Sequence, residues 1–169
     1  MNFGEILNAL QETPDLLLAA IDGLTEQNLR VKPKPDEFSV LENICHLRDL
    51  EVEAYTIRID RILNEENPAL LDFDGGKIAS ERDYHNEDVS VALSAFKAAR
   101  SYNVTRLSGL DSSQLNRNAV LEGVGKITLS DLATMMLEHD TGHLQDLSIE
   151  NTKLRTSYST ASTSTIRSR

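Results

Sequence analysis

Three things are scarce in this chain of 169 residues, and each absence excludes a class of protein. Cys45 is the single cysteine, so no internal disulfide forms; a small buried apolar role suits it, as does a reducing compartment. Basic residues number 17 against 27 acidic ones, and the formal net charge of -10 has the wrong sign for neutralising nucleic-acid phosphates. Neither a signal peptide nor the roughly 20 apolar residues of a membrane span is present. A soluble, cytoplasmic protein with no nucleic-acid or membrane partner is expected.

Glycine and proline are rare in the long apolar-periodic stretches, where Pro14 is the one proline and marks an expected break or restart. Apolar residues recur at spacings of three and four, without the alternation of strands. After residue 54 the pattern continues with some drift. Four helices are therefore predicted, over about residues 3–21, 40–64, 89–108 and 129–150.

Polar residues that cap helices precede three of these stretches. Ser39 with Glu42 forms an S-x-x-E capping box, Asp88 is a plausible N-cap, and Thr128 precedes the last helix. Residues 65–88 form a long connection that crosses the bundle or lines a site. The expected fold is an all-α, antiparallel four-helix bundle with this long crossover, in one domain of residues 1–150, followed by a flexible Ser/Thr-rich tail of residues 151–169.

The chain also shows a weak internal correspondence. Gly23-Leu24-Thr25, then the cap at Ser39, parallels Gly109-Leu110-Asp111, then the cap at Thr128. This pattern indicates two similar helix-loop-helix halves.

Three of the four histidines fit this correspondence. His139 and His143 are four residues apart on a predicted helix, so both side chains lie on one face and can turn toward a shared point. His46 follows Ser39 by seven residues, and the later pair follows Thr128 by eleven and fifteen. Because these offsets differ by multiples of four, the three histidines occupy corresponding inward faces, where metal sites form in helical bundles.

Spacing alone also admits a plainer interpretation, in which His46 is a hydrogen-bonded core residue and the later pair lies on a wet face. Asp49, three residues after His46, is the first candidate to accept the second N–H of that imidazole. His85 is expected in a surface loop. A di-iron carboxylate site needs two Glu-x-x-His motifs, which the chain lacks, and no G-x-S-x-G motif supports a hydrolase triad.

Around these residues the chain resembles the DinB/YfiT-like family of metal-dependent enzymes. The resemblance covers nearly everything from residue 3 to about 150, and rests on EFSVLENICHLRDLE at 37–51, Phe96 with Arg100, and the segment 129–143 that ends in EHDTGH. It implies a three-histidine site for one divalent metal, with His46, His139 and His143 at the ligand positions, and a homodimer.

The family includes thiol S-transferases, so the resemblance implies an enzyme in which the metal activates a low-molecular-weight thiol, or a water, against a small electrophile. Zinc or nickel suits three imidazoles best, with iron, manganese or copper as alternatives. Asp49, Tyr84 and Arg100 are the candidate catalytic contributors. The competing hypotheses are a non-catalytic or stress-associated metal-binding protein and a metal-free helical interaction module.

Overall fold

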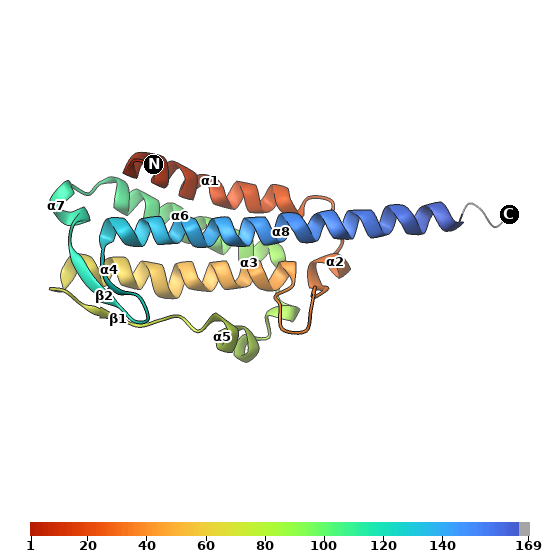
Figure 1. Ribbon diagram of the computed structural model, residues 1–169, viewed down its shortest axis with the longest axis horizontal. Helices are drawn as coiled ribbons and strands as arrows, with labels where there is room; N and C mark the ends of the chain where they lie inside the picture. Colours follow the sequence, from red (N-terminus) through yellow and green to blue (C-terminus); the bar gives the residue numbers. More distant parts are fainter. Residues whose placement is uncertain (166–169) are drawn as a thin grey trace.

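The computed structural model describes the backbone of residues 1–165 and the side chains of residues 1–148. Four long helical segments form the bundle (Figure 1). They are α1 (Phe3–Ile21), the continuous run α3 (Val40–Asp49), η1 (Leu50–Tyr55) and α4 (Thr56–Asn64), then α6 (Val89–Ser108) and α8 (Leu129–Thr165). The predicted four-helix bundle is confirmed. None of the described helices is both long enough and apolar enough to cross a membrane.

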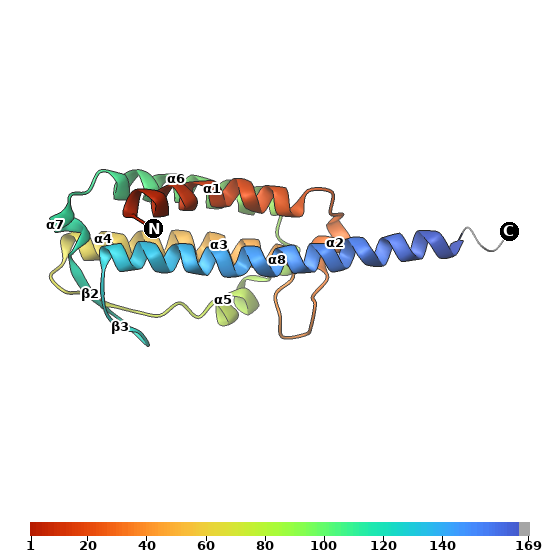
Figure 2. The same cartoon turned by 45° about the horizontal axis from the view of Figure 1, so that its top comes forward.

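Each helix of the bundle has one parallel and one antiparallel neighbour. Helix α1 is parallel to α8, and α3 is parallel to α6. Helix α1 is antiparallel to α6, and α3 is antiparallel to α8 (Figures 1 and 2). The predicted long crossover, residues 65–88, explains this arrangement because it returns the chain to the end of the bundle where α3 began. The antiparallel pair α3 and α8 carries all three histidines of interest.

Pro14 lies inside α1 without interrupting it, contrary to the expected break. A proline has no N–H to offer the carbonyl four residues earlier, here that of Leu10. Arg100 donates to this oxygen from Nη1 at 3.2 Å. A buried side chain of α6 thus satisfies the carbonyl that Pro14 leaves without a helical partner, and the helix continues.

The second helical run contains a π-helical segment, η1, that the sequence did not predict. Up to Ala54 the buried positions follow the expected stripe, but beyond it Tyr55, Arg58 and Ile59 are buried while Ile57 is half exposed. A π-turn accommodates one extra residue through i→i+5 hydrogen bonds, so it rotates everything after it relative to the preceding α-helix. This rotation is the physical cause of the drift in the sequence pattern.

The connections hold short elements that the sequence reasoning treated as polar loops. A three-stranded sheet lies beside the helices near one end of the bundle, with β1 parallel to β2 and β2 antiparallel to β3 (Figures 1 and 2). The short elements are α2 (Glu26–Arg30), β1 (Ala69–Leu70), α5 (Gly75–Arg82), η2 (Tyr84–Asn86), α7 (Ser112–Leu115), β2 (Asn118–Leu121) and β3 (Gly125–Thr128).

The N-caps agree with the sequence. Ser39 and Thr128 both form reciprocal capping boxes, and Asp88 caps α6 through its side chain. Thr25 and Asp111, the equivalent residues of the two predicted halves, each cap a short helix, α2 and α7.

Helix α8 extends beyond the predicted end near residue 150, as far as Thr165 (Figure 1). The predicted tail, residues 151–169, lies outside the residues whose side chains are described. Its mobility therefore stays a prediction.

Candidate metal centre

The three histidines meet between α3 and α8. His46 projects from α3, and His139 and His143 project from successive turns of α8. The Nε2 atom of His139 lies 3.4 Å from that of His46 and 3.3 Å from that of His143. Their ligand atoms all lie within 4.8 Å of one another, and this triad is the one group of that kind among the described residues.

These separations suit a bound cation. Two ligand atoms of a tetrahedral ion with bonds of 2.0–2.1 Å are about 3.3–3.4 Å apart, which is the spacing of both Nε2 pairs. A neutral imidazole offers one nitrogen lone pair, so three imidazoles whose Nε2 atoms converge have the composition of a ligand set for a divalent metal.

The tautomer of His143 is fixed by Asn43. The Asn43 amide donates from Nδ2 to the backbone oxygens of Phe38 and Ser39, so its Oδ1 faces the imidazole as an acceptor. His143 Nδ1 lies 2.6 Å from that oxygen and must carry the hydrogen. The lone pair of His143 is therefore on Nε2, directed toward the other two histidines.

The His46 ring is enclosed by aromatic rings and a glycine. Phe38 and Phe73 lie with ring centroids 5.4 and 6.0 Å from it. Gly75, the first residue of α5, is so close that a Cβ there would lie 2.4 Å from Cε1 and 2.5 Å from Nδ1 of His46. Glycine is thus the residue that leaves room for this imidazole.

Burial keeps the triad neutral. Desolvation, followed by the neighbouring imidazoles, lowers the pKa of His46 to about 3 and that of His139 to about 4. Desolvation lowers the pKa of His143 as well. Neutral histidine is the form that binds metal, so the ligands are ready near neutral pH.

A cavity of about 200 Å³ opens beside the triad. Its wall includes His46 and His139, and the remaining lining is mainly apolar. Two polar exceptions are Arg58 and Asp72, which come from α4 and from the crossover that follows it. Small-molecule sites have this character, with a few polar groups set among apolar walls.

The comparisons with known proteins settle the family. The model of the DinB superfamily matches residues 9–147 of this chain. The chain belongs to the DinB superfamily. Its relatives include a protein of Oceanobacillus iheyensis named "Putative metal-dependent hydrolase", 26% identical over 140 residues, which are 83% of this chain and 80% of that protein. A Geobacillus thermodenitrificans protein of the same name is 24% identical over 147 residues, 85% of this chain and 82% of the relative.

Among solved structures, the fold resembles YfiT from Bacillus subtilis, described as a probable metal-dependent hydrolase with an unusual four-helix bundle topology. The TM-score is 0.84 at 21% identity, over 90% of this chain and 87% of YfiT. The DinB/YfiT-like resemblance noted from residues 37–51, from Phe96 with Arg100 and from residues 129–143 is thereby confirmed.

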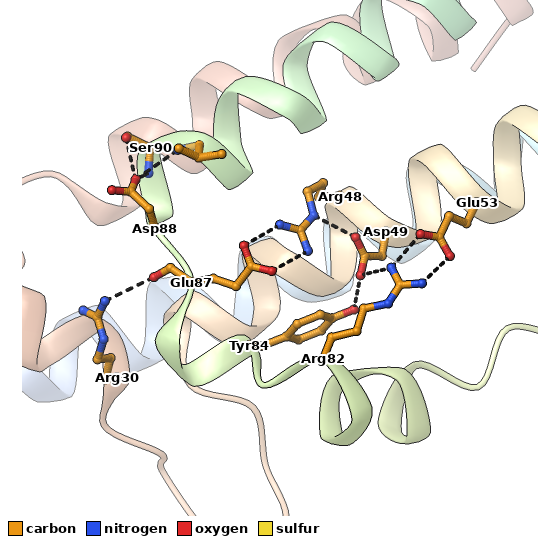
Figure 3. Close-up of polar contacts among 10 residues, drawn as sticks. Arg30, Arg48, Asp49, Glu53, Arg82, Tyr84, Glu87, Asp88 and Ser90 are labelled. Carbon is orange, nitrogen blue, oxygen red and sulfur yellow. Dashed lines mark hydrogen bonds and ion pairs between the residues drawn. The ribbon is translucent and has the colours of Figure 1, made fainter.

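In this DinB superfamily protein, Asp49 does not accept a hydrogen bond from His46, contrary to the expectation from the sequence. Its carboxylate accepts hydrogen bonds from Arg48 at 2.7 Å, Arg82 at 2.8 Å and the Tyr84 hydroxyl at 2.6 Å (Figure 3). Asp49 faces the crossover because these three donors compensate its burial. Although burial opposes ionisation, their hydrogen bonds and charges hold the pKa of this carboxyl below its usual value.

The Asp49 contacts fasten the crossover to α3. Arg82 also binds Glu53 through both of its Nη atoms, and Arg48 binds Glu87 further along the crossover (Figure 3). Since α5 begins at Gly75 and ends at Arg82, these contacts hold the glycine against the His46 ring. Asp49 and Tyr84 therefore belong to the contacts that anchor the crossover to α3.

Arg100, the third candidate contributor, lies in the core between α6 and α8. It is fully buried, forms an ion pair with Glu51 at 2.8 Å and binds Asp140, the residue after His139. Asn103 donates to the other oxygen of Glu51 at 2.8 Å. Within the described residues, Asp49, Tyr84 and Arg100 are not among those that line the cavity.

The sequence reasoning missed Tyr55, Arg58 and Gly75. The π-turn that positions Tyr55 and Arg58 left only the drift in apolar spacing as its signal. For Gly75, the glycine pair Gly75-Gly76 inside the predicted connection was the visible sign. His85, as expected, is exposed, and it is not part of the triad.

Proposed function

We propose that His46, His139 and His143 hold one divalent metal ion through their Nε2 atoms, and that the protein is a metal-dependent hydrolase or transferase of small molecules. The observation that carries the proposal is the convergence of three neutral imidazoles, two of which line a cavity. Zinc or nickel suits this ligand set, and iron, manganese or copper also binds imidazole.

When bound, such an ion lowers the pKa of a coordinated water or thiol and so supplies a nucleophile near neutral pH. The protein itself orients the imidazoles and keeps water away from the reacting group. Asn43 holds His143 in its ligating tautomer, and Gly75 and the phenyl rings fix the plane of His46. The apolar walls limit the water that reaches the reacting group.

Hydrolysis is the reaction favoured by the names of the curated relatives, which describe metal-dependent hydrolases. Transfer of a low-molecular-weight thiol to a small electrophile is the alternative use of the same nucleophile, in line with the thiol S-transferases of the family. For both reactions we assign positioning roles to Asp49 and Tyr84, whereas Arg100 has a structural role in the core. Homodimer formation and a cytoplasmic location stay predictions.

A purely structural metal is the competing proposal. Structural zinc sites are usually closed by four protein ligands, whereas catalytic sites keep one position open. Among the described residues the group has three members, and two of them face the cavity. The catalytic assignment is therefore the better supported one.

Elemental analysis of protein purified without a histidine tag tests the proposal. We expect about one equivalent of metal in the wild type. His139→Ala should lose it, while His85→Ala, which removes the exposed histidine outside the triad, should retain it. Retention of metal by His139→Ala would refute the proposed site.

Chelation tests whether the metal is catalytic. It should abolish turnover of small esters, amides or thiol–electrophile pairs while the helical signal in circular dichroism is kept. Parallel loss of helicity would favour a structural metal.

A further inference from the structure

Arg58 is a buried cation on the wall of the cavity that contains His46 and His139. Its side chain belongs to α4 and is 8% exposed. One of its five N–H donors binds the carbonyl oxygen of Leu71, with Nη2 2.7 Å away, and the guanidinium lies 5.8 Å from the ring centroid of Tyr55. The other donors have no hydrogen-bond partner among the described residues, so the fork can still bind a ligand.

Arg58 differs from two other buried or largely buried arginines of this protein, because it has no carboxylate partner among the described residues. The buried guanidinium of Arg100 contacts two carboxylates, and the largely buried Arg48 contacts Asp49 and Glu87. Arg58 forms no ion pair with any described residue. Asp72, which lines the same cavity, is exposed and acts on it only at longer range. Burial lowers the pKa of Arg58, whereas carboxylate partners raise the pKa of Arg48 and Arg100.

The π-helical segment places Arg58 on the same side of the helical run as His46. His46 and Arg58 are twelve residues apart, which in a regular α-helix of about 100° per residue leaves them about 120° apart around the axis. One extra residue in the wide turn takes back about 100°. Both side chains then face the cavity, as the lining shows.

We propose that Arg58 binds a carboxylate of the substrate, so that the substrate is a small apolar acid whose reactive group faces the histidine triad. The role of the triad in this statement rests on the proposed function. A bidentate carboxylate matches the guanidinium fork and supplies the counterion that a buried charge requires. The apolar body fits the remaining lining, which is Leu50, Tyr55, Phe73, Leu121, Val124 and Met135.

Calorimetric titration in the presence of chelator tests Arg58 without any contribution from metal. The probes are acetate, 4-methylpentanoate and phenylacetate, each paired with its neutral amide. We expect the wild type to prefer at least one apolar acid over its amide by about 10- to 100-fold, the range for a charged hydrogen-bonded pair. Arg58→Met should remove the preference, and Arg58→Lys should keep part of it as a point charge.

Arg61→Met is the matched control. Arg61 is on the same helix and also donates to a carbonyl of the following segment, that of Ala69, but it pairs with Glu65 outside the cavity. It should keep the wild-type preference. Thermal unfolding of each variant checks folding, and partial retention by Arg58→Lys shows that charge at this position, rather than a general disruption, sets the preference.

The inference is overturned by equal binding of acids and amides to the wild type, by no binding of any probe, or by an unchanged preference in Arg58→Met. Metal content separates it from the proposed function. A wild type without metal that still needs Arg58 for acid binding contradicts only the metal site. Full metal content with an unchanged Arg58→Met contradicts only the role of Arg58.

Discussion

Two buried polar clusters lie close together in this bundle, and they are satisfied in opposite ways. Around Arg100 the charges are complementary, because its guanidinium contacts Glu51 and Asp140. Asn103 donates a hydrogen bond to the second oxygen of Glu51. In the histidine triad the atoms that meet are alike, three Nε2 atoms with 3.3 and 3.4 Å between neighbours. Both clusters join helices that are distant in sequence.

The difference distinguishes a structural cluster from a binding site. Apart from Arg100 Nε, the first cluster is closed by the protein's own donors and acceptors, which makes it a device for holding α1, α6 and α8 in register. The triad also leaves Nδ1 of His46 and of His139 without a partner among the described residues. Three ring nitrogens that converge in this way are the arrangement expected of a ligand set for an external cation, and this is the basis of the proposed metal site.

The largest effect should come from the closed cluster. Arg100→Met leaves Glu51 and Asp140 buried without their cation, and removing one partner of a buried ion pair destabilises a protein by about 3–5 kcal/mol. Urea unfolding of the metal-free protein measures this loss. Metal binding by the fraction that remains folded should survive, because the arginine contacts none of the three imidazoles.

Arg106→Met is the control for that variant. Arg106 is on the same helix and pairs with Asp60, half of whose side chain is exposed, so its loss should cost at most about 1 kcal/mol. Equal destabilisation by the two substitutions would mean that the Arg100 cluster is no more structural than a surface ion pair.

A smaller effect is expected at the site itself, where two adjacent glycines offer a matched test. Gly75→Ala would place a Cβ within 2.4 Å of the His46 ring, so the ring must move from its position in the triad. We expect metal affinity to fall about 10- to 100-fold, as when support of a ligand is lost. Competitive titration with a chromophoric chelator measures it.

Gly76→Ala introduces the same methyl group one residue later, where its nearest neighbour is Asp74 Oδ1 at 3.7 Å, an ordinary contact. Its metal affinity should match the wild type. If the two alanine variants bound metal equally well, the close approach at Gly75 would have no bearing on the triad.

The sequence could predict the triad because helical spacing is a local property. The capping boxes set where α3 and α8 begin, and the four-residue interval between His139 and His143 sets their common face. The partner of Asp49 could not be predicted in this way. Its distance of three residues from His46 says nothing of Arg82 or Tyr84, which the crossover delivers from 33 and 35 residues away.

The cavity was beyond prediction for a related reason. Arg58 faces it only because of the π-turn, and i→i+5 hydrogen bonds follow no simple residue pattern. Strand β2 alternates buried and exposed residues, but over four positions this signal is too short to stand out in a polar connection. Tertiary packing decided both features.

Lowering the pH should destabilise the metal-free histidine triad gradually rather than in one step. In the metal-free protein, folding holds the pKa of His46 and His139 near 3 and 4, below the ordinary 6.5, so the unfolded chain binds more protons once the pH falls below 6.5. The free energy of unfolding should therefore be unaffected by these histidines above pH 6.5 and decline toward pH 4, by about 1.4 kcal/mol per pH unit for each buried histidine.

His139→Asn should make the decline shallower, whereas the exposed His85→Asn should leave it unchanged. Urea unfolding at pH 7.5, 6.5, 5.5 and 4.5 gives the slopes. A flat wild-type profile, or one that His139→Asn does not alter, would show that the imidazoles are not held neutral at the centre of the triad.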